Sequence, residues 1–196
     1  TTMGMVKLIS DAGKGESAHN YQFDIYGTAD EIVPLLVNGE VDIALVPSNL
    51  ASVLYNKTGG EVQVAAVSTL GVLSIVETGD TIKSIADLKG RTIYSTGTGT
   101  TPEYVLNYLL RENGLDPVKD VTIEYKSEAT ELAVLLSQSE NAVAVIPEPF
   151  ATVVRLQNPK VRTALDLTDE WEKASDGKSL ITGVVVVRKA FLEENE

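Results

Sequence analysis

The sequence predicts an α/β protein made of two similar lobes of strand–helix units. Three observations lead to this prediction: β-rich runs alternate with helical segments along the 196 residues, several runs are apolar throughout, and the chain contains an internal repeat. Uninterrupted apolar runs favour strands that are buried on both faces, as in a parallel sheet. The alternation of strands with helices favours right-handed βαβ units.

We predict nine strands, each bounded by turn-forming residues. The clearest are the apolar runs Val41–Val46 and Ala142–Ile146. The full set is Tyr21–Tyr26, Val41–Val46, Val62–Ser68, Val72–Glu77, Arg91–Ser95, Val121–Lys126, Ala142–Ile146, Val161–Leu165 and Ile181–Val187.

Two of the predicted helices carry clear boundary signals. Thr28 and Glu31 have the spacing of a capping box, and Gly39 ends the helix that follows them. Thr101 offers a hydroxyl cap to a second helix, with Pro102 at its first position. Both helices directly precede or follow a predicted strand, as βαβ units require.

Residues 28–54 are similar to residues 128–154 at a constant offset of 100 positions. Nine of the 27 aligned positions are identical, and most other pairs exchange one apolar residue for another. In both copies a helix, a buried strand, a proline and a second helix follow in that order, and the strand at 21–26 aligns with that at 121–126. Chance similarity between apolar segments is the alternative, but the matching order of elements favours two lobes of one architecture.

The repeat sets the expected division of the chain. We place lobe 1 at residues 1–72 and 185–196, and lobe 2 at residues 73–184. The strand and loop Arg91–Thr100 would have a counterpart just before Thr1, and the chain stops inside an apparent helix, Lys189–Glu196. We therefore expect the first strand and the C-terminal helices of lobe 1 to lie outside this sequence.

The composition excludes several classes of function. The 28 acidic against 16 basic residues give a formal net charge of −12, which argues against nucleic acid and anionic membranes as partners, since both need clustered Lys and Arg. With no cysteine, thiol catalysis and Cys-ligated metal centres are excluded. The single histidine, His19, cannot form a multi-His metal site and is badly placed for a catalytic triad. We expect no metal and no cofactor.

Ligands of α/β proteins bind at the carboxyl ends of the strands, in the loops that lead into helices. The segment Ser95–Pro102 is the richest of these loops: its two glycines expose backbone N–H groups, it carries five hydroxyls, and a helix begins behind it. Such a loop favours a small anionic or carbonyl-rich group. An ordinary polar turn is the alternative explanation of this loop.

Ser48 and Asn49 follow the predicted strand Val41–Val46, and Glu148 follows the predicted strand Ala142–Ile146. Helix capping alone would explain Ser48 and Asn49. For Glu148 we favour stabilisation of the helix dipole over contact with a ligand.

Three segments of the chain resemble extracytoplasmic solute-binding proteins of ABC importers. They are Asp42-Ile43-Ala44-Leu45-Val46-Pro47, Ser84-Ile85-Ala86-Asp87-Leu88-Lys89-Gly90-Arg91-Thr92-Ile93, and the Thr-Gly loop before Thr101-Pro102. The similarity covers essentially the whole chain and is greatest for the nitrate, taurine, alkanesulfonate and thiamine-precursor branch. It implies the type II periplasmic-binding-protein fold, in which two α/β lobes surround a ligand cleft and are joined by two crossover strands, here near Leu70–Glu77 and Ile181–Val187.

The resemblance also implies which residues contact the ligand, because members of this family use helix N-termini that face the cleft. The matching positions are Thr1, Thr2, Ser48, Asn49, Thr96, Gly97, Thr98, Gly99, Thr100, Thr101 and Glu148. It further implies a small-molecule solute, a permease of an ABC transporter as partner, a monomer, and an extracytoplasmic location, either periplasmic or as a cell-surface lipoprotein. No catalytic activity is expected.

Two other functions stay open at this point. An enzyme on the same fold, of the menaquinone-pathway kind, would need an acid or base in the cleft, for which Glu148 is the only candidate. A ligand-sensing effector domain of a LysR-type regulator would need a DNA-binding domain upstream.

Overall fold

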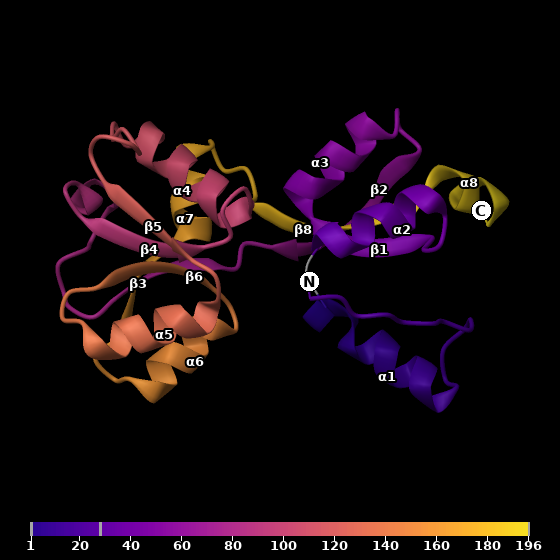
Figure 1. Ribbon diagram of the computed structural model, residues 1–196, viewed down its shortest axis with the longest axis horizontal. Helices are drawn as coiled ribbons and strands as arrows, with labels where there is room; N and C mark the ends of the chain where they lie inside the picture. The colour runs from indigo at the N-terminus through magenta and orange to yellow at the C-terminus, as the bar shows by residue number, and fades with distance from the viewer. Residues whose placement is uncertain (1, 28, 196) are drawn as a thin grey trace. The chain divides into compact units, whose positions relative to one another are not determined.

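The computed structural model describes residues 2–27 and 29–195, and its contacts divide the chain into two compact units (Figure 1). Unit 1 comprises Thr1–Leu70 and Ile181–Glu196, and unit 2 comprises Gly71–Leu180. The chain thus passes between the units after residues 70 and 180, where we expected boundaries after residues 72 and 184.

Unit 2 contains a five-stranded mixed sheet with the strand order β5–β4–β6–β3–β7. Strand β4 (Thr92–Thr96) lies parallel to both β5 (Thr122–Lys126) and β6 (Val143–Pro147). Strand β3 (Leu73–Glu77) is antiparallel to β6 and to β7 (Arg162–Asp166). All five residues of β3 are buried, since this strand lies inside the sheet and is covered on both faces.

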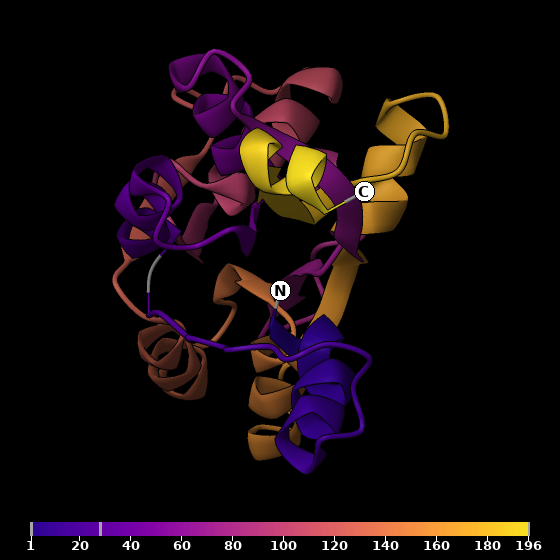
Figure 2. The same ribbon diagram turned by 90° about the vertical axis from the view of Figure 1, so that its right-hand side faces the viewer.

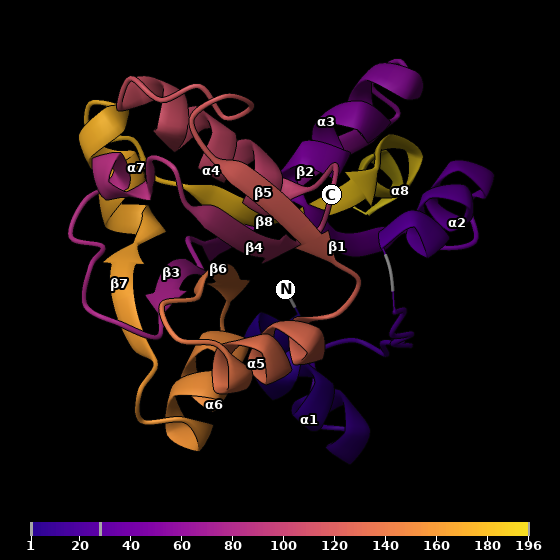
Figure 3. The ribbon, with the colours of Figure 1, turned by 60° about the vertical axis from the view of Figure 1, so that its left-hand side comes forward.

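Helices cover both faces of this sheet, as Figure 3 shows. Helices α4 (Thr101–Glu112) and α7 (Leu167–Ala174) contribute to one apolar cluster, together with the short helix η3 (Ile85–Leu88). Helices α5 (Ala129–Gln138) and α6 (Phe150–Gln157) contribute to a second cluster on the other face. Apolar residues on alternate positions of the strands therefore face one cluster or the other, which explains the uninterrupted apolar run predicted for β6.

Unit 1 contains a three-stranded antiparallel sheet with the order β1–β8–β2. Its strands are β1 (Ile43–Pro47), β2 (Val62–Leu70) and β8 (Ile181–Arg188). Helices α2 (Ile32–Asn38) and α3 (Ser48–Lys57) pack on one face of this sheet. The cluster that they form consists of Leu36, Ala44, Val46, Ala51, Leu54, Val62, Val184 and Val186.

Among the residues whose burial is described, none in the remaining helices of unit 1 belongs to a core cluster. These helices are η1 (Thr2–Met5), α1 (Val6–Lys14), η2 (Ala29–Glu31) and α8 (Lys189–Glu194). Neither α1 nor α8, indigo and yellow in Figure 2, has a buried residue. Unit 1 is thus the less densely covered half of the molecule.

The prediction of a parallel sheet around Val41–Val46 is wrong for unit 1. The C-terminal strand β8 lies between β1 and β2 and runs antiparallel to both, so the two strands that share a direction do not touch. The apolar run of β1 is also not buried on both faces, because Ile43 is 46% exposed while Ala44 is buried.

Three further predictions need correction or fall outside the description. Residues 21–26 form no strand; they are irregular. Helix α4 begins at Thr101 itself, and Thr100 is the residue that precedes it, with extended backbone. Thr28, the expected cap, lies outside the described residues. The aligned helix α5 does have a capping box, between Glu128 and Glu131.

Candidate functional site

The predicted ligand loops of unit 2 lie at one edge of its sheet. In the parallel register of β4 and β5, Thr96 lies opposite Lys126, and Tyr94 pairs with Ala144 of β6 on the other side. The loop after β4 and Glu148 after β6 therefore lie beyond the carboxyl ends of neighbouring parallel strands. This is the position at which open α/β sheets bind ligands.

The loop between β4 and α4 is held in one conformation by its own contacts. Gly97 and Gly99 both have left-handed backbone, with φ of 78° and 73°. The N–H of Thr100 donates to the carbonyl of Gly97 at 3.0 Å, and the hydroxyl of Thr100 donates to the same carbonyl. A Cβ atom at Gly97 would collide with Oγ1 of Thr100, so this glycine is required by packing as well as by its dihedral angles.

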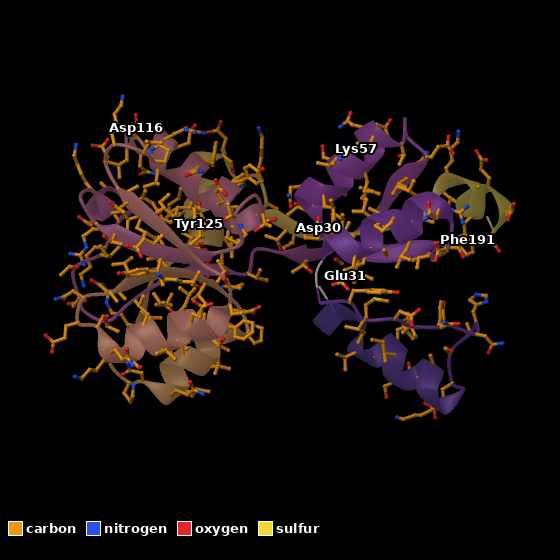
Figure 4. All side chains as sticks on the ribbon, in the orientation of Figure 1. Asp30, Glu31, Lys57, Asp116, Tyr125 and Phe191 are labelled. Atoms are coloured by element: carbon orange, nitrogen blue, oxygen red, sulfur yellow. The ribbon has the colours of Figure 1, made fainter. Side chains whose placement is uncertain are left out.

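Glu103, in the first turn of α4, is a site residue that the sequence did not reveal. Its carboxylate accepts a hydrogen bond from the N–H of Gly99 at 2.6 Å. Burial raises the pKa of the Tyr125 hydroxyl, and the negative charge of Glu103 raises it further. Tyr125 is labelled on β5 in Figure 4. A carboxylate in this place stabilises the start of the helix and disfavours an anion beside Gly99.

Lys126 is a second residue that the sequence analysis missed. It ends β5, and its ammonium lies 3.2 Å from the carboxylate of Glu124 and 5.4 Å from the centre of the Tyr94 ring. Its side chain is only 28% exposed. Lysine and arginine are missing from the segments that hold the predicted ligand contacts, which are Thr1–Gly4, Pro47–Asn49, Ser95–Thr101 and Pro147–Phe150. The last residue of β5 lies at the same end of the sheet as the loop after β4. The position of Lys126 at the end of a predicted strand was the signal that could have identified it.

Glu148 supports a helix, as we favoured from the sequence. Its carboxylate accepts a hydrogen bond from the N–H of Thr152 in the first turn of α6, at 3.1 Å. Its own N–H donates to the carbonyl of Val72 at 2.8 Å. The side chain thus satisfies one of the N–H groups that every helix leaves without an intrahelical partner.

In unit 1, Ser48 and Asn49 are the first two residues of α3 and are half-buried. The hydroxyl of Ser48 donates to the carbonyl of Ile181 at 2.8 Å, which ties the start of the helix to β8. Thr1 lies outside the described residues, and Thr2 begins η1. The structure therefore brings Thr96 to Thr101 and Glu148 to one sheet edge in unit 2, and places Ser48 and Asn49 in unit 1.

A pocket of about 600 Å³ adjoins Ser48 within unit 1. It lies between α3 and the strands β2 and β8, and no charged side chain lines it. Its lining residues are Ser48, Ala51, Ser52, Tyr55, Gln63, Val64 and Val184.

The described residues hold no group of His, Asp and Glu side chains suited to a metal ion. In the same part of the chain, each helix is too short or too polar to cross a membrane.

Comparison with known proteins gives one family and many similar folds. The family model of periplasmic substrate-binding proteins of phosphonate ABC transporters matches residues 16–193. Comparison with curated proteins gave no match.

Among solved structures, an ABC transporter protein from Parabacteroides distasonis is 26% identical with a TM-score of 0.71, covering 95% of this chain and 64% of that one. The periplasmic aliphatic sulphonate binding protein SsuA from Escherichia coli is 18% identical with a TM-score of 0.73, covering 98% of this chain and 63% of that one. The alkanesulfonate-binding protein SsuA from Xanthomonas axonopodis pv. citri, bound to MOPS, is 16% identical with a TM-score of 0.65, covering 98% and 63%. The chain thus spans less than two thirds of the length of these structures, and at the two lower identities the likeness concerns the fold, which is that of type II periplasmic binding proteins.

Proposed function

Because the chain belongs to the family of periplasmic substrate-binding proteins of phosphonate ABC transporters, we propose that it binds a small solute outside the cytoplasm and delivers it to a membrane permease. The observation that carries this proposal is the polar edge of the sheet in unit 2. There the Thr96–Thr100 loop and the start of α4 follow β4, and Lys126, the last residue of the parallel strand β5, pairs with Thr96 in the strand register.

We propose further that the solute is a small organic or anionic compound. Its class would be one of those suggested by the sequence resemblance: an alkanesulfonate such as taurine, nitrate, or a precursor of thiamine. Lys126 would meet the negative charge, and the hydroxyls of Thr96 and Thr98 would complete the contact. The carboxylate of Glu103 accepts the N–H of Gly99 and would disfavour an anion at that glycine.

The remaining functional proposals follow from membership of a transport family. We propose that the protein acts as a monomer, without catalytic turnover, and that it lies in the periplasm or is attached to the cell surface as a lipoprotein. The use of the Glu148 carboxylate in capping α6 supports the absence of turnover, because Glu148 was the acid or base for which the sequence analysis left a catalytic role open. Steady product formation that is lost in the variant Glu148→Gln would contradict the proposed absence of turnover.

The experiment combines native mass spectrometry of the freshly purified protein with calorimetry. The probes are methylphosphonate, ethanesulfonate, nitrate and an aminopyrimidine. We expect Lys126→Met to weaken binding of an anionic probe by about ten- to a hundredfold, the loss of one hydrogen bond to a charged group. Lys119→Met is the matched control: Lys119 precedes β5 at its opposite end, is 82% exposed and pairs with Asp116.

The variant Glu103→Gln distinguishes an anionic solute from a cationic one. An anionic solute should bind this variant as well as the wild type or more tightly, while a cationic solute should bind it more weakly. Binding that is insensitive to Lys126→Met but lost in Glu103→Gln would overturn the anionic class and leave the transport function standing. If native mass spectrometry shows no retained solute and no probe binds, the transport proposal itself fails.

A further inference from the structure

We propose that the pocket between α3 and β2 in unit 1 is a second small-molecule site, and that its ligand is a small uncharged aromatic compound of the phenol class. Its volume of about 600 Å³ lies within the range of ligand pockets in proteins. All of its lining residues belong to unit 1. The proposal concerns a ligand other than the transported solute and does not depend on the proposed function.

The helix that borders the pocket and its counterpart in unit 2 face their sheets in the same way. Helix α3 packs against β2 and β8 (Figure 1), and helix α6 occupies the aligned place in unit 2. The aligned residues Ala51 and Ala151 are both buried, and so are the aligned residues Leu54 and Val154. The other aligned positions of the two helices therefore point in corresponding directions.

In unit 2 an arginine side chain bridges the groove between α6 and β7. One guanidinium nitrogen of Arg155 donates to the hydroxyl of Thr163 on β7 at 3.1 Å, and the other donates to the hydroxyl of Thr152 on α6 at 3.4 Å. In unit 1, Tyr55 is aligned with Arg155, and Ser52 is aligned with Thr152. The hydroxyl of the helix is thus retained in unit 1, while an aromatic ring replaces the guanidinium.

The strand side of the groove also differs between the units. Thr163 pairs with the residue of β3 that lies opposite Ala144, and Val64 pairs with the residue of β8 that lies opposite Ala44. Val64 therefore takes the place of Thr163 and offers no hydroxyl. The pocket of unit 1 lies where the bridge of Arg155 lies in unit 2.

The walls of the pocket suit an aromatic ring. Ala51 and Val184 are buried and supply apolar surface, while the side chain of Tyr55 is 53% exposed. A Cβ atom at Gly60 would lie 3.5 Å from the Tyr55 ring, so the backbone of the neighbouring turn supports that ring on one side. An aromatic ligand can pack against the part of the ring that is exposed.

A hydroxyl group, and no charge, accompanies these apolar walls. Ser52 and Tyr55 lie three positions apart on α3 and so share one face of the helix. The hydroxyl of Ser48 already donates to the carbonyl of Ile181, so the hydroxyl of Ser52 is the partner that we assign to a phenolic hydroxyl. None of the described residues that line the pocket is Lys, Arg, Asp or Glu. Since an ionic ligand would lose hydration without gaining an opposite charge, the site favours an uncharged ligand.

The test is a titration of the isotope-labelled protein with phenol, followed through the NMR signals of backbone amides and tyrosine rings. We expect saturable shifts confined to α3, to residues 60–64 and to β8, with a Kd of about 1 mM for a ligand of this size. Methylguanidinium and acetate, which carry opposite charges, should not produce these shifts.

The double variant Tyr55→Arg with Val64→Thr recreates the bridge of unit 2 in unit 1. Both side chains are 53% exposed, so the variant should fold, and its thermal midpoint checks this. We expect it to weaken phenol binding at least about tenfold. Tyr55→Leu removes the aromatic ring alone and should weaken binding about two- to tenfold. The matched control is Tyr104→Arg on α4, because Tyr104 is 55% exposed; this variant should bind phenol as the wild type does.

Shifts that do not saturate, or that spread over both units alike, would overturn the proposal. Equal binding by the wild type and the double variant would overturn it too, as would an equal loss in Tyr104→Arg. Tighter binding of methylguanidinium than of phenol would overturn the uncharged class of ligand. Solute binding is not among the quantities measured here, so this proposal and the transport function can fail separately.

Discussion

Ile43 and Val143 occupy aligned positions of aligned strands, yet the first is 46% exposed and the second is fully buried. The units differ in what surrounds these strands. In unit 2 the strand lies between β4 and β3 under helices on both faces, whereas in unit 1 the sheet has three strands and helices on one face. The comparison of β1 with β6 shows that an apolar run specifies a strand. Whether that strand is buried depends on the neighbouring strands and helices that the rest of the chain supplies.

The largest predicted effect follows from the aligned pair Leu106 and Val6. Leu106 is fully buried in the core of unit 2, so Leu106→Ala should lower the free energy of unfolding by about 2–5 kcal/mol. Val6 is 61% exposed, and Val6→Ala should change it by less than about 0.5 kcal/mol.

Urea denaturation of the two variants measures the difference, with the slope of unfolding as a check that each still unfolds in the same way. Equal losses in both variants would mean that α1 is packed like α4, and would remove the contrast between the units.

The same contrast explains how far the fold could be predicted from the sequence. Eight of the nine predicted strands are present with boundaries shifted by at most a few residues, because their apolar runs and bounding turns are local signals. The strand at Tyr21–Tyr26 failed, since a strand forms only with a partner and this segment has none among the described residues. The direction of β1 also could not be predicted, because its neighbour β8 comes from the other end of the chain.

Only part of the candidate site could be predicted from the sequence, and the reason is similar. The glycines and threonines of residues 96–101 form a local motif and were identified from the sequence. Lys126 and Glu103 were not, because their roles depend on contacts that the spacing of residues does not reveal. The register of β5 against β4 places Lys126 opposite Thr96, and the turn after β4 brings the N–H of Gly99 to the carboxylate of Glu103.

Unit 2 contains a buried ion pair between the last residue of β3 and the first residue of β7. The carboxylate of Glu77 is fully buried and lies 2.6 Å from a guanidinium nitrogen of Arg162. It also accepts hydrogen bonds from the N–H and hydroxyl of Thr81 and from the N–H of Ile82. Burial alone would raise the pKa of Glu77, but these hydrogen bonds and the charge of Arg162 outweigh it and hold the pKa below its ordinary value. In unit 1 the residue aligned with Arg162 is the apolar Val62.

The second largest predicted effect is the loss of stability when the ion pair between Glu77 and Arg162 is removed. Arg162→Met should lower the free energy of unfolding by about 2–3 kcal/mol, since it removes a hydrogen bond to a buried charge. Lys83→Met, which breaks the exposed pair with Asp80, is the control and should change it by less than about 0.5 kcal/mol.

The lowered pKa of Glu77 also fixes the sign of a pH dependence. Its contribution to stability is complete above the ordinary carboxyl pKa and is lost as the pH falls through the lower pKa of the folded state. Glu77→Gln should therefore be less stable than the wild type at neutral pH, and its stability should fall less steeply on acidification. Parallel pH profiles of the two proteins would contradict this account.

The smallest predicted effect concerns two glycines of the candidate site that share a backbone conformation and differ in their surroundings. Both Gly97 and Gly99 have positive φ, so alanine at either position should cost about 1 kcal/mol of stability. A Cβ at Gly97 would in addition collide with Oγ1 of Thr100, whereas a Cβ at Gly99 would have no atom within 4 Å apart from its two chain neighbours. Gly97→Ala should therefore lower the free energy of unfolding by about 1 kcal/mol more than Gly99→Ala. The double variant Gly97→Ala with Thr100→Ser keeps the hydroxyl and so the collision, while Gly97→Ala with Thr100→Ala removes it. Urea denaturation should show recovery only in the second, and equal losses for both single variants would mean that the loop adjusts freely and that Thr100 does not fix its shape.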